Sequence, residues 1–190
     1  MKGRFVSLDP KKTYIPDATV KVFDGLTVDW YNGHQVVAYK LEAVSEDIVN
    51  KWAKHVMDTL ENWDKAHPYL AIHDLSKPGV SLQFAALVNF DMMNIGITMG
   101  GRIACESLFD EHEDWYGRVA IKFNLSLSGQ TNRTLMNYLN QDHPRTAYKT
   151  FYNRTKCLRW LTTGITDTSE MKAVEDVEDK ADSDKTANKN

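Results

Sequence analysis

The chain has 190 residues, of which 42% are hydrophobic and 26% are charged, and its formal net charge is −3 at pH 7. Seven Phe, eight Tyr and five Trp are enough to build a core, which excludes a chain that is disordered throughout. No stretch reaches the roughly 18 uninterrupted apolar residues of a membrane span, and no basic block points to nucleic acid as the partner. The first ten residues lack the apolar region of a secretory signal, so we expect a cytoplasmic protein.

The sequence predicts three parts. Residues 1–22 are expected to form an irregular N-terminal arm, because Pro10 and Pro16 interrupt it, and residues 23–164 are expected to form one α/β domain. Residues 165–190 have no aromatic residue and hold eight acidic residues and four lysines, a charge of −4. A segment this polar buries too little apolar surface to offset its chain entropy. We therefore predict a disordered acidic tail, which either keeps the protein soluble or binds a basic partner.

A strand pair opens the predicted domain. Residues 26–31 alternate apolar and polar side chains, which is the period of a half-buried strand. Asn32-Gly33 and the strand-like run 35–41 follow. Asn-Gly between two such runs favours a two-residue turn, because both positions of that turn need a positive φ. The pattern therefore predicts a β-hairpin.

A long amphipathic helix should follow the hairpin. Ser45 is a good N-cap, and Glu46 and Asp47 stand in the first turn, where the helix dipole favours negative charge. Apolar residues then recur at helical spacing. They are Ile48, Val49, Trp52, Val56, Leu60 and Trp63.

Strands and helices alternate in the rest of the domain. The run 69–72, apolar on both faces and ending in His73-Asp74, is typical of an inner parallel strand. Ser81 is expected to cap the next helix, and Asn153 the last one. Further strands are expected at residues 117–124 and 146–151, with a helix at 131–139 between them. The order ββαβαβαβα predicts a mixed sheet of about five strands, a hairpin followed by parallel strands, with helices mainly on one face.

This order of elements resembles a STAS-type domain, the fold shared by anti-sigma-factor antagonists and the cytoplasmic ends of sulphate transporters. The resemblance rests on the hairpin, the strand and exit at residues 69–76, Gly79-Val80 before a helix, and residues 117–121 and 151–161. It implies a regulatory module that acts through protein–protein contact, with no catalytic residue, cofactor or metal of its own. It also implies that partners dock near the loop that follows the central strand.

The chain departs from the family at one functional position. In the regulatory members a phosphorylatable Ser sits beside an Asp at the start of the helix after the central strand. By position, that pair falls near Phe84, Ala85 and Ala86 in this sequence. Alanine has no hydroxyl to accept a phosphoryl group, so a phospho-switch of this kind is not expected here.

The loop at residues 73–81 is the candidate site. It leaves the carboxyl end of an inner strand and enters a helix, a place where open α/β sheets bind ligands. A hydrolase is not expected there, since no Gly-x-Ser-x-Gly elbow is present. The alternative is that Pro78-Gly79 only turns the chain and Ser81 only caps a helix. The candidate ligand- or partner-binding residues are His73, Asp74, Ser76, Gly79, Ser81 and Gln83.

The apolar stretch at residues 82–99 leaves a second hypothesis open. Met92, Met93 and Met99 are flexible side chains that suit a core, a homodimer face or an adaptable binding surface. Our leading hypothesis is a non-enzymatic cytoplasmic interaction module with a protein partner. The alternative is a small-ligand binder that takes an anionic, lipid-like or nucleotide-like molecule in an apolar pocket beside residues 82–99.

Overall fold

A single six-stranded sheet organises the protein. The computed structural model describes residues 15–84, 107–112, 114–139 and 145–163. Strand order in the sheet follows the chain, β1-β2-β3-β4-β5-β6. The first three strands pair antiparallel and β3 to β6 pair parallel, which confirms the predicted mixed α/β sheet. The strands are β1 Ala18–Phe23, β2 Leu26–Tyr31, β3 Val36–Leu41, β4 Tyr69–Asp74, β5 Gly117–Lys122 and β6 Thr146–Phe151.

Two of the helices begin at the predicted caps. The helices are α1 Glu46–Glu61, α4 Leu127–Leu139 and α5 Arg154–Thr162, and residues 78–84 and 107–110 are also helical. Ser45 Oγ accepts a hydrogen bond from the backbone N–H of Ile48 at 3.3 Å, and Asn153 Oδ1 accepts one from the N–H of Thr155 at 2.8 Å. Each cap satisfies a donor that the first helical turn leaves without a partner.

The predicted hairpin is present, but its turn is longer than the Asn-Gly signal indicates. Tyr31 pairs with Val36, so the loop has four residues, 32–35. Asn32, Gly33 and His34 all have positive φ, at 56°, 62° and 67°. The N–H of Gln35 donates to the carbonyl of Asn32 at 3.3 Å, which closes the loop. The prediction of a two-residue turn was wrong because His34 also adopts the left-handed conformation and thereby extends the loop.

Residues 18–22, expected in the irregular arm, belong to strand β1, which raises the sheet to six strands. Val20 pairs with Val28, and Thr19 Oγ1 donates to Asp29 Oδ1 at 2.7 Å. The two strands form a hairpin around Asp24-Gly25, where Gly25 has a φ of 114°, so a local turn signal for β1 was present and was missed. Several predicted features lie outside the described residues: the rest of the arm up to residue 14, the apolar residues 85–99, and the acidic tail at 165–190.

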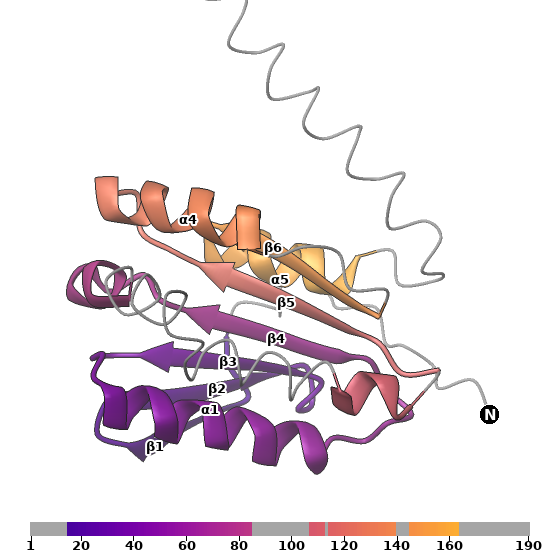
Figure 1. Cartoon of the computed structure of the whole chain (residues 1–190). Coiled ribbons are helices and arrows are strands. Elements are labelled where there is room, and N and C mark those ends of the chain that lie inside the picture. Colours follow the sequence, from indigo (N-terminus) through magenta and orange to yellow (C-terminus); the bar gives the residue numbers. More distant parts are fainter. Residues whose placement is uncertain (1–14, 85–106, 113, 140–144, 164–190) are drawn as a thin grey trace, which may run out of the picture.

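The parallel strands place their connecting helices on one side of the sheet. Each crossover moves one strand further in the same direction, and right-handed crossovers of that kind all fall on one face. Helix α1, the helical residues 78–84 and α4 lie on that face, while α5 follows the last strand and packs on the other (Figure 1). The expectation that the helices cover mainly one face is confirmed.

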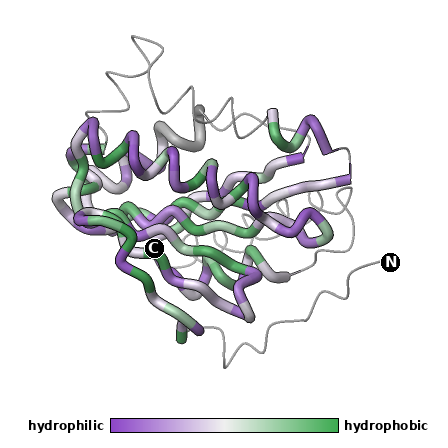
Figure 2. The backbone as a smooth tube through the Cα atoms, turned by 90° about the horizontal axis from the view of Figure 1, so that it is seen from below, coloured by the Kyte–Doolittle hydropathy of each residue, from purple (hydrophilic) through white to green (hydrophobic). Residues whose placement is uncertain are grey.

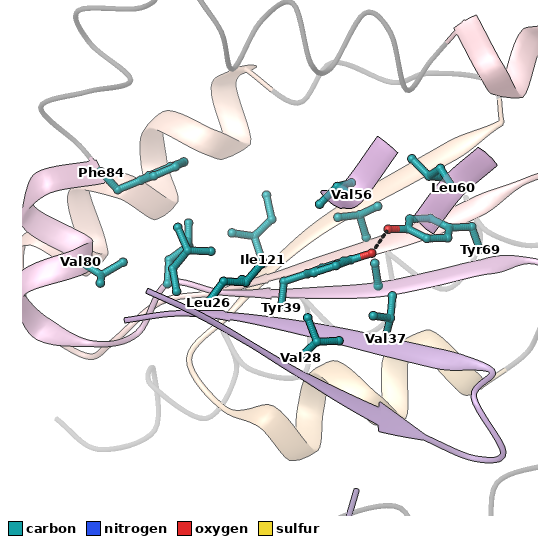
Figure 3. Packing of buried hydrophobic residues seen from close by; sticks show 14 of the residues in the cluster. Leu26, Val28, Val37, Tyr39, Val56, Leu60, Tyr69, Val80, Phe84 and Ile121 are labelled. Atoms are coloured by element: carbon teal, nitrogen blue, oxygen red, sulfur yellow. Dashed lines mark hydrogen bonds between the residues drawn. The ribbon is translucent and has the colours of Figure 1, made fainter. Parts of the chain in front are cut away.

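Successive side chains of each strand point to opposite faces of the sheet, so a hydrophobic core forms on each face. On the α1 face, the buried side chains of the sheet meet Val56 and Leu60 from α1 and Val80 and Phe84 from residues 78–84 (Figure 3). Hydrophobic stretches lie in the strands at the centre of the molecule (Figure 2). The smaller core on the α5 face contains Tyr31, Val36, Ala38, Leu70, Ile72, Ala120, Cys157, Leu158 and Leu161. Burial raises the pKa of the Cys157 thiol to about 12, as expected for a reduced core cysteine.

Candidate functional site

The predicted site lies where the carboxyl ends of β4 and β5 meet. Residues 75–83 leave β4 and residues 123–127 leave β5, and we call these two segments together the carboxyl rim. Asp74 pairs with Lys122 in the sheet register, and the N–H of Leu75 donates to the carbonyl of Lys122 at 2.8 Å. The two segments are therefore neighbours along the same edge of the sheet.

The first two candidate residues, His73 and Asp74, are adjacent in β4 and lie on opposite faces of the sheet. His73 lies on the α1 face, where its ring stacks on Tyr39 with centroids 5.2 Å apart and meets the edge of Trp52 at 5.2 Å. Asp74 is buried on the α5 face. Adjacent residues of a strand necessarily point to opposite sides. An acid–base pair built from His73 and Asp74 is therefore not assembled.

Ion pairs gather around Asp74 and Asp29 on the α5 face. Lys122 Nζ lies 3.1 and 3.0 Å from the two carboxylate oxygens of Asp74, and Lys40 Nζ lies 3.0 Å from Asp29 Oδ2. Arg154, the first residue of α5, donates to Asp29 at 3.3 Å and to Asp74 at 3.4 Å. We call these five residues the ion cluster. Two carboxylates and three cations give it a formal charge of +1.

Ser76 belongs to the same network. Its hydroxyl donates to Asp74 Oδ1 at 2.6 Å and accepts from Lys122 Nζ at 2.6 Å. Its backbone N–H also donates to Asp74 Oδ1, at 3.1 Å. Burial by itself would raise the pKa of Asp74, but these hydrogen bonds and the charge of Lys122 outweigh burial and lower it. Asp74 is thus a carboxylate held ionised by its neighbours.

Ser81 does not cap a helix, which corrects the prediction made for it. The helical residues begin at Pro78, and the N–H of Ser81 already donates to the carbonyl of Lys77 at 3.0 Å. The buried hydroxyl of Ser81 donates to the carbonyl of Leu75 at 2.5 Å. Proline suits the first helical position because it has no N–H to satisfy. The helix therefore starts one turn earlier, and Ser81 fastens it to the end of β4.

The remaining candidates, Gly79 and Gln83, are exposed on the outer side of the helical residues. Leu82 beside them is 66% exposed. Across the rim, Leu125 is 77% exposed and Leu127, the first residue of α4, is 83% exposed. Asn132 of α4 donates to the carbonyl of Ser81 at 2.5 Å, which links the two segments. The rim therefore presents three exposed leucines on an anchored support.

The structure thus brings Asp74 and Ser76 together, separates His73 and Ser81 from them, and leaves Gly79 and Gln83 at the surface. Sequence reasoning missed four partners of this site: Asp29, Lys40, Lys122 and Arg154. Lys122 ends a predicted parallel strand, and the carboxyl ends of such strands share one edge, so its position carried a usable signal. The position of Asp29 in the sequence carried no such signal, because the side chains that bond to it from outside β2 come from three separate elements, β1, β3 and α5.

The described part of the chain holds no helix with the length and apolar character needed to cross a membrane. Within the same residues, no three His, Cys, Asp or Glu side chains are grouped as metal ligands would be. Comparison of the chain with protein-family models, with curated proteins and with solved structures gave no match. The function must therefore be argued from the geometry of the site itself.

Proposed function

We propose that this chain is a non-enzymatic, cytoplasmic regulatory module of STAS-like type that binds a protein partner through the carboxyl rim. The observation that carries the proposal is the exposure of Leu82, Leu125 and Leu127 along this one edge of the sheet. Large apolar side chains grouped at a surface mark interaction sites more often than scattered ones do. Among the described residues, the other exposed large hydrophobics are Ile15 and Val20, which belong to the β1 end of the chain.

The rim is rigid enough to act as a preformed surface. Ser81 ties one segment to the end of β4, and Asn132 ties α4 to that segment. In the other segment, Ser126 Oγ donates to Asn124 Oδ1 at 2.5 Å and accepts from the N–H of Gly129 at 3.1 Å. Contacts of this kind hold loops in one conformation, which lowers the entropic cost of binding.

The polar groups of the rim support contact rather than chemistry. The carboxylate of Asp74 is engaged by Ser76, Lys122 and Arg154. The hydroxyl of Ser81 is engaged by the carbonyl of Leu75, and His73 faces the other side of the sheet. A nucleophile needs a base within hydrogen-bond reach. The hydroxyl of Ser76 does donate to Asp74, but the hydrogen bonds from Ser76 and the charge of Lys122 lower the pKa of that carboxyl, so it is a weak base.

The charges around the rim define the chemistry of the partner. Lys77 is exposed, and the ion cluster, in which Lys122 and Arg154 are paired with Asp74 and Asp29, keeps a formal charge of +1. We therefore assign to the rim a partner segment with apolar side chains flanked by acidic ones. Its apolar side chains would pack on the leucines, and its acids would steer the approach.

The test compares affinity capture by the wild-type chain with capture by the double variant L82D/L127D. Ile15→Asp is the matched control, because Ile15 is 76% exposed but lies before β1, at the hairpin end of the sheet. The captured protein is then purified and titrated directly against all three chains. We expect L82D/L127D to weaken binding at least tenfold and Ile15→Asp to leave it within twofold.

Equal binding by the wild type and L82D/L127D, or no partner binding in stoichiometric amount, contradicts the proposal. Light scattering on the purified chain alone distinguishes self-association. A dimer that L82D/L127D dissociates would replace the foreign partner with a second copy of the chain and so overturn the assignment.

A further inference from the structure

The α5 side of the sheet carries positive charge beyond that of the ion cluster. Residues 145–163, which include β6 and α5, contain five basic residues and no acidic one. Lys149 pairs in register with Ala120, which belongs to the core on the α5 face, so Lys149 lies on that face. Lys156 and Arg159 are exposed and stand three residues apart in α5, which places them on one side of the helix. We call Lys149, Lys156 and Arg159 the basic face.

The basic face has no acidic partner within the part of the chain that the structure describes. The ion pairs found there include none of its three residues. Lys156 also shares the first turn of α5 with Arg154, and that turn holds no acid, although the helix dipole favours negative charge at this end. Arg154 is compensated within the ion cluster, so the charge that lacks compensation is that of the basic face.

A second observation concerns Arg118 of β5, which is buried at the other end of α5. Its Nη1 donates to the carbonyls of Trp160 and Thr163, at 2.8 Å each. Its Nε is closed to solvent and has no hydrogen-bond partner, and no carboxylate of the described residues pairs with this side chain. Burial lowers the pKa of Arg118, which marks an unfavourable environment for its charge. Buried charges are normally paired, so Arg118 lacks a counter-charge close to Thr163, where α5 ends.

The acidic tail has the opposite charge and begins at this position. Residues 165–190 hold eight acidic residues and four lysines. The first acid, Asp167, follows Thr163 by four residues, and four extended residues span at most about 14 Å. Arg159 precedes Thr163 by four helical residues, which is about 6 Å along the axis of α5. A chain that turns back after Thr163 can therefore bring Asp167 and Glu170 alongside the exposed side of α5.

We propose that the acidic tail, residues 165–190, docks on the basic face of its own chain, with Asp167 and Glu170 as the first contacts. These carboxylates lie opposite Lys156 and Arg159 and supply the counter-charge that Arg118 lacks. Attachment to the end of α5 makes the contact intramolecular, and the high effective concentration of a short tether favours it over contact with a second chain. The inference goes beyond protein docking at the carboxyl rim, because it uses β6 and α5 instead of the exposed leucines.

Zero-length cross-linking tests the contact directly. A water-soluble carbodiimide joins a carboxylate to a lysine amine only where the two groups touch. The full chain is treated at low salt as an equal mixture of isotopically light and heavy protein, and linked peptides are identified by mass spectrometry. The exposed ion pair of Asp47 and Lys51, 2.7 Å apart in α1, is the positive control for the chemistry.

The variant K156E/R159E reverses two charges of the basic face. Its matched control is K51E/K54E, which makes the same change of net charge at two exposed lysines of α1. We expect the wild type to form links from tail acids to Lys149 and Lys156 within one chain. The link to Lys149 should fall at least fivefold in K156E/R159E and stay within twofold in K51E/K54E. It should also weaken at high salt, since exposed charges are screened over about 10 Å at 0.1 M.

Hydrogen exchange of the α5 amides provides the second readout. Asp167→Asn with Glu170→Gln should speed exchange at residues 154–163 at least twofold, because the docked segment no longer covers them. Asp182→Asn with Asp184→Asn removes the same charge from the far end of the tail and should leave the exchange unchanged. Circular dichroism verifies that every variant is folded.

Three results overturn the proposal. They are tail links as frequent to Lys51 and Lys54 as to Lys149 and Lys156, equal exchange in the two tail variants, and links found only between light and heavy chains. The last result would make a second copy of the chain the occupant of the basic face. The rim variant L82D/L127D should form the same links as the wild type, so failure of this proposal is distinguishable from failure of the docking function.

Discussion

Asp29 is the most heavily engaged side chain of the ion cluster. Its carboxylate, 2% exposed, accepts from Thr19 and Tyr31 and is paired with Lys40 and Arg154. Burial by itself would raise the pKa of Asp29, but the hydrogen bonds from Thr19 and Lys40 and the two positive charges outweigh burial and lower it. Asp29 therefore joins β1, β2, β3 and α5 through one charged group.

Replacing Asp29 with Asn should destabilise the protein by about 1–3 kcal/mol, because Lys40 and Arg154 lose their buried counter-charge while staying partly hydrated. Urea unfolding at pH 7 measures the change. Asp24→Asn is the control, since Asp24 pairs with Lys21 in full solvent exposure, and it should cause no measurable change. If the urea midpoint of Asp29→Asn equalled that of the wild type, the ion cluster would contribute no net stability.

At the scale of elements, Gly79 and Gly129 lie in the first turns of the two helices that follow β4 and β5, and they differ in their surroundings. A Cβ at Gly129 would overlap the carbonyl oxygen of Asn124, so α4 can approach the end of β5 only with glycine there. A Cβ at Gly79 would meet nothing within 4 Å. The close approach at Gly129 fixes the turn that displays Leu125 and Leu127.

Gly129→Ala should therefore cost about 1–3 kcal/mol in unfolding free energy, because the α4 turn must move away from Asn124. Gly79→Ala should be neutral or stabilise by up to about 1 kcal/mol, since alanine reduces the entropy of the unfolded chain and fits the helix. Denaturant unfolding of both variants, measured side by side, tests the pair. Equal effects at the two positions would contradict the assigned role of Gly129.

At the scale of the whole molecule, stability should depend on pH through the half-buried histidines His73 and His55. The folded-state pKa of His73 is about 4, against 6.5 for a free imidazole. Burial lowers the pKa of His55 as well, opposed by the nearby charge of Asp58. Between pH 6.5 and 4 the unfolded chain binds a proton at His73 that the folded chain does not. Stability therefore falls as the pH falls through this window.

His73 alone should lower the free energy of unfolding by about 3 kcal/mol at pH 4, because each unit of difference between its folded and unfolded pKa corresponds to roughly 1.4 kcal/mol. In His73→Phe most of the slope between pH 6.5 and 4 should disappear. The control variant His112→Gln, which replaces an exposed histidine, should retain this pH dependence of the unfolding free energy. Below about pH 4, protonation of Asp29 and Asp74 removes further stability in every variant, because both folded-state pKa values are lowered. Unfolding free energies measured at half-unit pH steps test this; an unchanged slope in His73→Phe would contradict it.

Local patterns were enough to predict most of the elements. The alternation at residues 26–31, the strand-like run at 35–41, the helical spacing after Ser45, and the caps at Ser45 and Asn153 all involve residues a few positions apart. The order of strands and helices then determined the parallel sheet and the single face of its crossovers. The start of the helix at Pro78 was missed because Ser81 also resembles a cap, and only its buried bond to Leu75 reveals its role.

The sequence by itself determined the α/β architecture and the edge of the sheet at which the candidate residues lie, because periodicity and capping act over a few residues. The tertiary structure alone decided which side chains meet. Asp29 and Arg154 are 125 positions apart, and Trp52 reaches His73 only when α1 packs on the sheet. Such contacts are selected by packing and charge compensation in the folded chain, and no local pattern encodes them.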